Sequence, residues 1–363
     1  MSARRPALLP ATLLCASAAL HAGSASAADD CAAANGFTPL CGFQHPEDIE
    51  VLADGKLLVV SEYGNLVGSM TGRLTAVVPA DGSRRTLYPV DGADGTADWG
   101  AADCPGAPGA QFDPHGIHHG PTSNGRLYVV NHAGRESVEI FEVVDGDDAA
   151  AMKLNWRGCV IAPGGIWMND VVGLPDGGFI ASHMVQKGVS AESLYESERR
   201  REDIGHVMRW SPGDGWRKVT NSDGALPNGV EISDDAATLY VNEYFGDRTF
   251  ALDLASGKRL WTTPVDAPDN LAWGSDGQLL IASHHEDLKA VQACEHEQPY
   301  CQLRFSIVAV DPANGNRLTV VEGGGAPPFG AATVAAEVGD TMYLGSYTGD
   351  RMATTTRGTG VRD

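Results

Sequence analysis

The sequence predicts an all-β fold, a six-bladed β-propeller with one short helical insertion near residues 190–203. The first observation is a cassette that recurs about six times: a polar pair, an apolar-alternating run, a Gly-containing turn and a short strand that ends in a polar residue. The second is spacing, because the copies begin roughly 40 to 70 residues apart, which suits four-strand blades with variable loops. The third is that helical periodicity is almost absent between the Gly, Pro, Asp and Asn residues that separate the runs.

The polar pair is placed at the start of the inner strand of each blade. In a propeller the inner strands all run the same way beside the axis, so the six pairs should meet at one end of a central channel. The pairs are Glu47-Asp48, His115-Gly116, Asn169-Asp170, Asn228-Gly229, Asp269-Asn270 and Ala332-Thr333.

A second set of residues lies just after the strand that follows each inner strand. These strands run antiparallel to the inner ones, so we expect their ends to lie farther from the axis. The set consists of Glu62, His132, His183, Glu243, His284 and Tyr347.

The segment at residues 190–203 departs from the strand pattern because it is charged and compatible with a helix. It follows the third hairpin. A solvated surface helix is one interpretation. A lid over one mouth of the channel is the other, since long insertions in a compact repeat often shape active sites.

Composition narrows the class of protein. The chain has 363 residues, of which 43% are hydrophobic, and a formal net charge of −21. The hydrophobic content is ample for a core, and a repeat architecture of this length can form one domain. The acidity argues against a nucleic-acid partner and suits solubility and cation binding.

The N-terminus has the features of a secretory signal. Arg4 and Arg5 precede an apolar stretch that runs to about Leu20, and small residues follow up to Ala27. We therefore expect a signal peptide over 1–27, a single propeller domain over 28–363, and a periplasmic or secreted protein. Since no later segment has the uninterrupted apolar length of a membrane span, none is expected.

The cysteines left after removal of the signal number six, and an oxidising compartment favours disulfides. Six cysteines permit 15 connectivities. The preferred pattern joins near neighbours and pairs the remaining two: Cys31 with Cys41, Cys294 with Cys301, and Cys104 with Cys159.

The polar pairs have the chemistry of a hard-cation site. They offer carboxylates and carboxamides without a thiolate, and oxygen ligands in this number favour calcium over zinc. The candidates for one shared ion are Glu47, Asn169, Asn228, Asp269 and Asn270. Each Asn or Asp could instead cap a turn, but five such residues at equivalent positions are less expected by chance.

An ordered set of segments resembles the paraoxonase/arylesterase family. That family belongs to a wider group of six-bladed calcium propellers that includes senescence marker protein 30 and gluconolactonases. The segments that carry the resemblance are Glu47-Asp48-Ile49-Glu50, Phe112-Asp113-Pro114-His115-Gly116-Ile117, Val130-Asn131-His132, Asn169-Asp170-Val171, Pro227-Asn228-Gly229 and Asp269-Asn270-Leu271.

The resemblance implies two calcium ions and hydrolysis of a small-molecule lactone or aryl ester. A catalytic ion would be held by the five candidates above, and a structural ion by Asp48, Asp170 and the backbone carbonyl of Ile117. His115 would be the base that activates water, with His132 as its partner and His284 farther along the pocket wall.

Two alternatives stay open. In the gluconolactonase-like branch an acidic ligand is the expected base, which makes Asp269 the candidate for hydrolysis of sugar lactones. The protein could also be a non-catalytic propeller in which calcium only stabilises the blades and the surface binds a partner.

The sequence departs in one respect from the animal members of the paraoxonase/arylesterase family. No cysteine follows Cys301, so strand pairing or another bridge must close the ring.

The place of the substrate is also suggested by the pairs. Ala332-Thr333 offers no ligand, so we expect room for substrate at the sixth blade. The apolar residues beside the motifs, Trp99, Trp167 and Met168, are candidates for a pocket wall.

Overall fold

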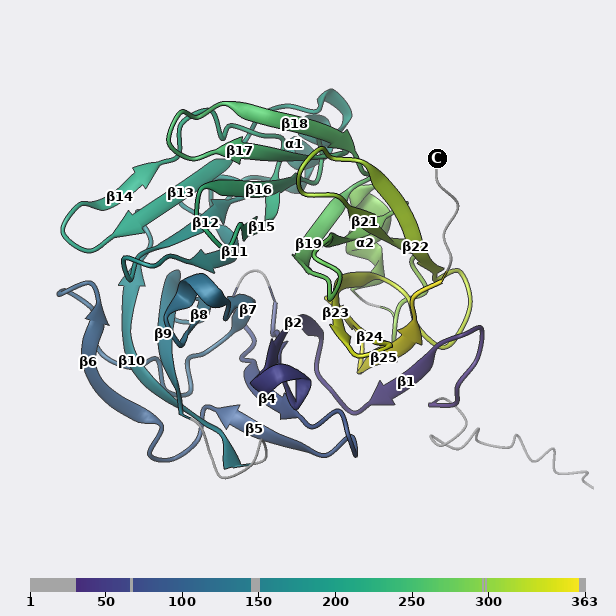
Figure 1. Ribbon diagram of the computed structural model, residues 1–363, viewed down its shortest axis with the longest axis horizontal. Helices are drawn as coiled ribbons and strands as arrows, with labels where there is room; N and C mark the ends of the chain where they lie inside the picture. The colour runs from purple at the N-terminus through teal and green to yellow at the C-terminus, as the bar shows by residue number, and fades with distance from the viewer. Residues whose placement is uncertain (1–30, 66–67, 145–150, 296, 298, 359–363) are drawn as a thin grey trace, which may run out of the picture.

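The computed structural model describes residues 31–65, 68–144, 151–295, 297 and 299–358. The predicted signal peptide over 1–27 lies outside these residues. Six sheets are arranged in a ring around a central channel, as Figure 1 shows. The prediction of an all-β six-bladed propeller is confirmed.

The first three blades follow the chain from the inside outward, except for one extra strand. Blade 1 consists of β2 (Pro46–Leu52), β3 (Leu57–Glu62), β4 (Arg73–Val77) and β5 (Arg84–Tyr88). Blade 2 consists of β7 (Pro114–His118), β8 (Arg126–Asn131), β9 (Ser137–Val144) and β10 (Lys153–Ile161), with β6 (Asp94–Gly100) as a fifth strand parallel to β10. Blade 3 consists of β11 (Met168–Gly173), β12 (Phe179–His183), β13 (His206–Ser211) and β14 (Gly215–Lys218).

The last three blades include the closure of the ring. Blade 4 consists of β15 (Pro227–Ile232), β16 (Thr238–Glu243), β17 (Arg248–Asp253) and β18 (Arg259–Pro264), and blade 5 of β19 (Pro268–Trp273), β20 (Leu279–His284), β21 (Phe305–Val310) and β22 (Arg317–Gly323). Blade 6 consists of β23 (Ala332–Val338), β24 (Thr341–Ser346) and β25 (Arg351–Thr356), completed by β1 (Thr38–Cys41) from the N-terminal side. Because β1 pairs antiparallel with β25, strand pairing closes the ring.

Five of the six inner strands begin at the residue before their polar pair, and β23 begins at Ala332, the first residue of its pair. Prolines 46, 114, 227 and 268 open four of the six inner strands. Proline is tolerated there because the first residue of a strand need not donate a ladder hydrogen bond. In all six inner strands the register with the next strand shifts at the polar pair. Such irregularities re-aim side chains and are common next to functional sites.

Glycine in two of the pairs permits the inner strands to approach closely. A Cβ on Gly116 would lie 2.5 Å from the Cα of Asp170, and one on Gly229 would lie 2.7 Å from the Cα of Asn270. Both contacts are with backbone, which cannot move aside like a flexible side chain.

The apolar side chains of adjacent sheets fill the space between blades, for example Leu239 and Phe250 of blade 4 against Val172 of blade 3.

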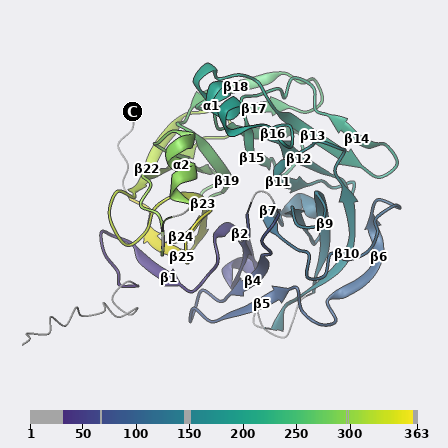
Figure 2. The ribbon, with the colours of Figure 1, turned by 180° about the vertical axis from the view of Figure 1, so that it is seen from behind.

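The helices lie on one face of the ring, the face nearer the viewer in Figure 2. The predicted helical insertion is present as α1 (Ala191–Arg200), capped by the Ser190 side chain, which accepts a hydrogen bond from the Ser193 amide. A second helix that the sequence did not predict, α2 (Leu288–Cys294), packs beside it. Two short 3₁₀ turns, η1 (Ala53–Gly55) and η2 (Pro121–Ser123), follow β2 and β7 on the opposite face.

The disulfides join the three predicted pairs: Cys31 to Cys41, Cys104 to Cys159 and Cys294 to Cys301. They are compatible with an oxidising compartment. Within the described part of the chain, no helix is long and apolar enough to cross a membrane.

The close approach at Gly229 predicts a stability effect. Gly229→Ala should lower the free energy of unfolding by about 1–3 kcal/mol, because the new methyl group meets the backbone of the adjacent inner strand. Urea denaturation measures the change. Gly164→Ala is the control, since a Cβ there meets open space. Equal midpoints for the two variants would contradict the packing argument.

Candidate functional site

A cavity of about 600 Å³ opens at the end of the channel that faces the helices. The inner strands deliver the first residue of five polar pairs to its floor. The predicted site residues among its lining are Glu47, His115, Asn169, Asn228, Asp269 and His284. His132 and Asn270 lie directly behind them, hydrogen-bonded to His115 and Glu47 respectively.

Side-chain amides lie beside the two carboxylates of this floor. The Nδ2 of Asn270 donates to Oε1 of Glu47 at 2.8 Å, and the Asn228 side chain acts to lower the pKa of the Asp269 carboxyl. The carbonyl oxygens of both amides are left for another partner.

Four buried oxygen atoms of the floor have no hydrogen-bond partner among the described residues. An unsatisfied buried acceptor costs free energy, and native structures contain few of them. Carboxylate and amide oxygens are the ligands that a hard cation prefers. The four atoms are Oε2 of Glu47 and the Oδ1 atoms of Asn169, Asn228 and Asn270.

The electrostatics of the floor also favour a cation. Burial, together with the nearby Glu47 carboxylate, raises the pKa of Asp269 well above its usual value. Burial and the same carboxylate raise the pKa of Asp48 to about 8. Several carboxylates thus share a region of low dielectric, an arrangement that a bound positive charge relieves.

His115 and His132 form a pair at the edge of this floor. Nδ1 of His115 lies 2.8 Å from Nε2 of His132, and the ring of Tyr63 stacks on His115 with centroids 4.8 Å apart. The other nitrogen of His115 faces the floor, with Nε2 3.6 Å from Oε1 of Glu47. Burial alone would lower the pKa of His115, but Glu47 and Asp269 outweigh it and raise the pKa above its usual value.

His284 has a different environment. Its Nδ1 accepts a hydrogen bond from the Tyr244 hydroxyl at 2.8 Å, and its Nε2 donates to the backbone carbonyl of Ala332 at 3.0 Å. Burial lowers the pKa of His284 to about 4. This imidazole is neutral with both nitrogens engaged, so it belongs to the cavity wall.

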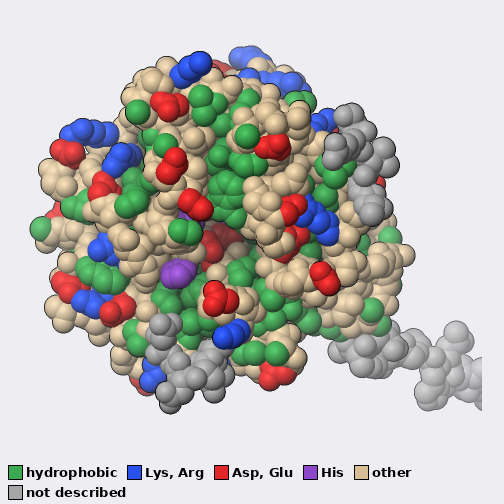
Figure 3. Space-filling model, in the orientation of Figure 1, with side chains coloured by type: hydrophobic (Ala, Val, Ile, Leu, Met, Phe, Trp, Pro, Cys, Tyr) green, Lys and Arg blue, Asp and Glu red, His purple; other side chains and the backbone are tan. Residues whose placement is uncertain are grey.

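The second members of two pairs lie at the other end of the channel, in a smaller cavity of about 190 Å³. Asp48, Ile117 and Asp170 line it together, and Figure 3 shows acidic and histidine side chains around the hollow at this end. Here both oxygens of each aspartate accept backbone amides. Asp48 accepts from Ile49 and Ile117, and Asp170 accepts from Val171 and Val230.

The outer set of polar residues forms no second site around the channel. Glu62 is paired with Arg73, and Glu243 with Arg248, each within one blade. These carboxylates brace neighbouring strands. Only His132, His284 and Tyr347 of that set contact the cavity or its floor.

The cavity wall is largely apolar. Both helices contribute, Leu194 from α1 and Leu288 and Val291 from α2, and a hydrogen bond from Tyr195 to Gln292 joins the helices. The insertion is therefore part of the mouth. The remaining apolar and aromatic lining includes Tyr63, Met70, Trp167, Met184, Leu226, Tyr244, Phe245 and Tyr347.

The expectations for the wall are met in part. Trp167 lines the cavity, but Met168 lies in the core between blades 2 and 3, and Trp99 is covered by the guanidinium groups of Arg126 and Arg157. Thr333 donates to the backbone carbonyl of Glu47, while Tyr347 and Thr348 of blade 6 line the cavity.

The family can be assigned by comparison. The profile of the SMP-30/Gluconolactonase/LRE-like region matches residues 65–294. This stretch is more than half of the 363-residue chain, so the protein belongs to that family. No curated protein sequence gives a significant match.

Solved structures with the same fold include three with similar scores. A gluconolactonase from Xanthomonas campestris is 16% identical over 88% of this chain and 89% of its own, with a TM-score of 0.51. A putative gluconolactonase is 15% identical over 90% of this chain and 94% of its own, with the same TM-score of 0.51. A luciferin-regenerating enzyme is 14% identical over 89% and 96%, again with a TM-score of 0.51. At these identities the likeness concerns the fold.

The raised pKa of Asp48 predicts how stability depends on pH in the metal-free protein. Because the folded state holds this proton up to about pH 8 and the unfolded state loses it near pH 4, stability should fall as pH rises between these values. Asp48→Asn should flatten that slope, measured by urea denaturation with a chelator present. The exposed Asp91→Asn is the control. An Asp48→Asn slope as steep as that of the wild type would contradict the assignment.

Proposed function

We propose that this protein is a calcium-dependent hydrolase of lactones or aryl esters, acting in the manner of the paraoxonase/arylesterase family. One observation carries the proposal. Four buried oxygens without partners among the described residues belong to side chains that line or back the floor of one cavity, and His115 lies at the same floor, with Nε2 3.6 Å from Oε1 of Glu47.

The residues that would hold the catalytic Ca²⁺ are Glu47, Asn169, Asn228, Asp269 and Asn270. Their carboxylates and amides offer oxygen ligands, and the Glu47 carboxylate already accepts a hydrogen bond from the Asn270 amide. When bound, the ion supplies an electrophilic centre that polarises a carbonyl and stabilises negative charge on its oxygen. A second, structural ion at Asp48, Ile117 and Asp170 belongs to the same proposal, although backbone amides already occupy both aspartates.

His115 is suited to take a proton from the attacking water. Its Nε2 faces the floor, and its Nδ1 is engaged with His132 behind it. The stacked Tyr63 ring limits rotation of the imidazole. A base held in this way meets the geometric requirement for general-base catalysis.

The apolar wall excludes water and suits a substrate with a hydrocarbon or aromatic part. Leu194, Phe245, Leu288 and Val291 offer no hydrogen bond to a polyhydroxylated ring. A site that binds a sugar lactone must pair its hydroxyl groups, because buried hydroxyls without partners are costly.

Hydrolysis of a sugar lactone with Asp269 as base is the second candidate. It is favoured by the raised pKa of Asp269 and by the two gluconolactonases among the structures of similar fold. The burial of Asp269 among the ligand candidates leaves it less free than His115 to move a proton.

A chelator experiment with a substrate panel tests the proposal. EGTA should abolish hydrolysis of aliphatic lactones and phenyl acetate before the protein unfolds, and added Ca²⁺ should restore it. Initial rates on these substrates should exceed the rate on gluconolactone. Loss of stability with no hydrolysis of any substrate would instead support a non-catalytic propeller, and a preference for gluconolactone would support the second candidate.

The role of His115 is tested by His115→Gln. This change should lower kcat for lactones by about two orders of magnitude or more, because it removes the base and keeps the side-chain volume. Calorimetric Ca²⁺ binding should stay close to that of the wild type. His206→Gln is the control, because His206 lies on β13 of blade 3 and not on an inner strand. Turnover unchanged by His115→Gln would eliminate the assigned role.

A further inference from the structure

Glu136 is a buried acid that the sequence did not single out. It lies in the turn between β8 and β9, four residues after His132, and its side chain is 9% exposed. Its Oε2 lies 3.0 Å from Nδ1 of His132, and its Oε1 accepts the backbone amide of Met168 at 2.7 Å. Glu136 thus connects the histidine pair of blade 2 to the strand of blade 3 that carries Asn169.

The chemistry of this contact decides the direction of the hydrogen bonds. An ionised carboxylate can only accept, so His132 must donate from Nδ1. In the neutral imidazole Nε2 of His132 is then an acceptor, and His115 must donate to it from Nδ1. The remaining nitrogen of His115, Nε2, therefore keeps its lone pair and points it at the floor of the cavity.

The contact with Asn169 agrees with this direction. Its Nδ2 lies 3.5 Å from Nε2 of His115, the side on which an unprotonated nitrogen can accept. If His132 instead carried its proton on Nε2, its Nδ1 would be an acceptor and would need a hydrogen-bond donor facing it. An ionised Glu136 provides no such donor.

The charge of Glu136 is maintained by its surroundings. Burial by itself would raise the pKa of this carboxyl. The facing His132 imidazole, the Met168 amide and Lys187 outweigh that effect and hold the pKa below its usual value. Lys187 lies 3.1 Å from Oε2 and is itself well exposed.

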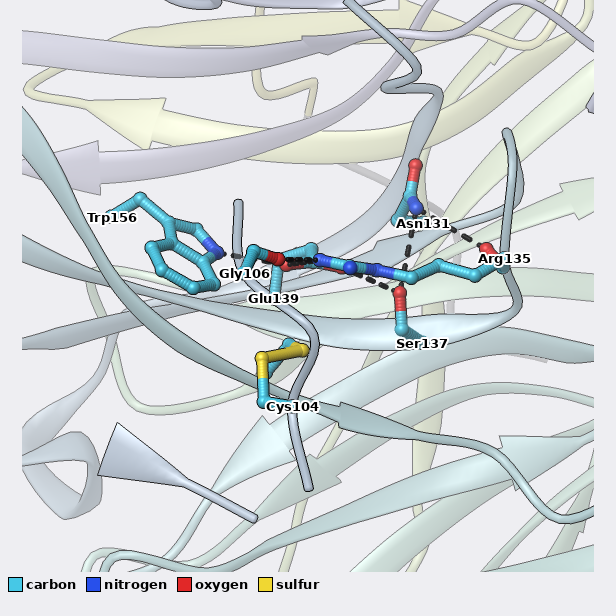
Figure 4. Close-up of a disulfide and its surroundings, with 8 residues drawn as sticks. Cys104, Gly106, Asn131, Arg135, Ser137, Glu139 and Trp156 are labelled. Atoms are coloured by element: carbon cyan, nitrogen blue, oxygen red, sulfur yellow. Dashed lines mark hydrogen bonds and ion pairs between the residues drawn. A yellow bond between two sulfur atoms is a disulfide. The ribbon is translucent and has the colours of Figure 1, made fainter. Parts of the chain in front are cut away.

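The turn that carries Glu136 is braced on its other side, as Figure 4 shows. Arg135 makes two hydrogen bonds of 2.8 Å to the buried Glu139 and a third to the carbonyl of Gly106, two residues from the Cys104 disulfide. The amide of Asn131 donates to the carbonyls of Ala133 and Arg135. These contacts fix the backbone on both sides of His132.

We infer that Glu136 is a positioning residue that fixes His132 and His115 in the tautomers presenting Nε2 of His115 to the substrate. The inference rests on the proposed function for its catalytic meaning. The arrangement is a carboxylate and two imidazoles in series, in which Glu136 touches neither substrate nor ion. It acts through the two rings.

Nitrogen-15 spectra of histidine-labelled protein test the inference without relying on turnover. Imidazole nitrogen shifts distinguish protonated from unprotonated positions, and His115→Gln and His132→Gln assign the signals. The wild type should carry protons on Nδ1 of both rings. A proton on Nε2 of His132 would overturn the inference, and this result stands even if every Glu136 variant fails to fold.

Glu136→Gln tests the consequence. His132 and the Met168 amide donate to different carboxylate oxygens, and in glutamine one of these becomes an NH2 group that cannot accept. The tautomers should therefore become mixed, and kcat should fall about tenfold to a hundredfold with KM nearly unchanged. Glu142→Gln, the same change at a carboxylate of β9 that pairs with Arg157 instead, should leave tautomers and kcat as in the wild type.

Retention of either the wild-type tautomers or the wild-type kcat in Glu136→Gln would refute the role. A wild type that hydrolyses no lactone would refute the proposed function alone. The spectra would still decide whether Glu136 sets the tautomers.

Discussion

The structure depends on bringing the ends of six inner strands together around one narrow channel. The hydrogen bond from Asn270 to Glu47 joins residues 223 positions apart, and the link from Thr333 to the Glu47 backbone spans even more of the chain. Both contacts join blades from distant parts of the chain, as does the pairing of β1 with β25 that closes the ring. The site is therefore a property of the complete ring, since its residues come from five different blades.

Close packing at the channel concentrates polar groups where water is scarce. Carboxylates and amides are buried together: the Asn270 amide pairs with one oxygen of Glu47, while the other Glu47 oxygen and the Asn270 oxygen have no partner among the described residues. Buried polar atoms without partners are few in native proteins. The same crowding explains the glycines at 116 and 229, because any side chain there would meet the neighbouring inner strand.

Glutamates with largely buried side chains have two different roles in this fold: some pair with arginine, and one contacts an imidazole. Glu62, Glu139 and Glu243 each pair with arginine inside one blade and hold its strands in register. Glu136 lies three residues from Glu139, yet it faces an imidazole and the adjacent blade. Glu62 and Glu243 end their strands, Glu139 lies within β9 and Glu136 lies in a turn, and no sequence signal separated their roles before the fold was known.

The sequence by itself determined the propeller, the six polar pairs and the disulfide pairs, because these follow from local periodicity, turn chemistry and a small number of cysteines. It also placed Glu47, His115, Asn169, Asn228 and Asp269 at one end of the channel, since equivalent positions in a radial repeat must converge. Only the tertiary structure decided which oxygens stay unpaired, that His284 is held by Tyr244 and the Ala332 carbonyl, and that Glu136 stands behind His132. Those outcomes depend on side-chain contacts between blades and on turn geometry, which no repeat pattern specifies.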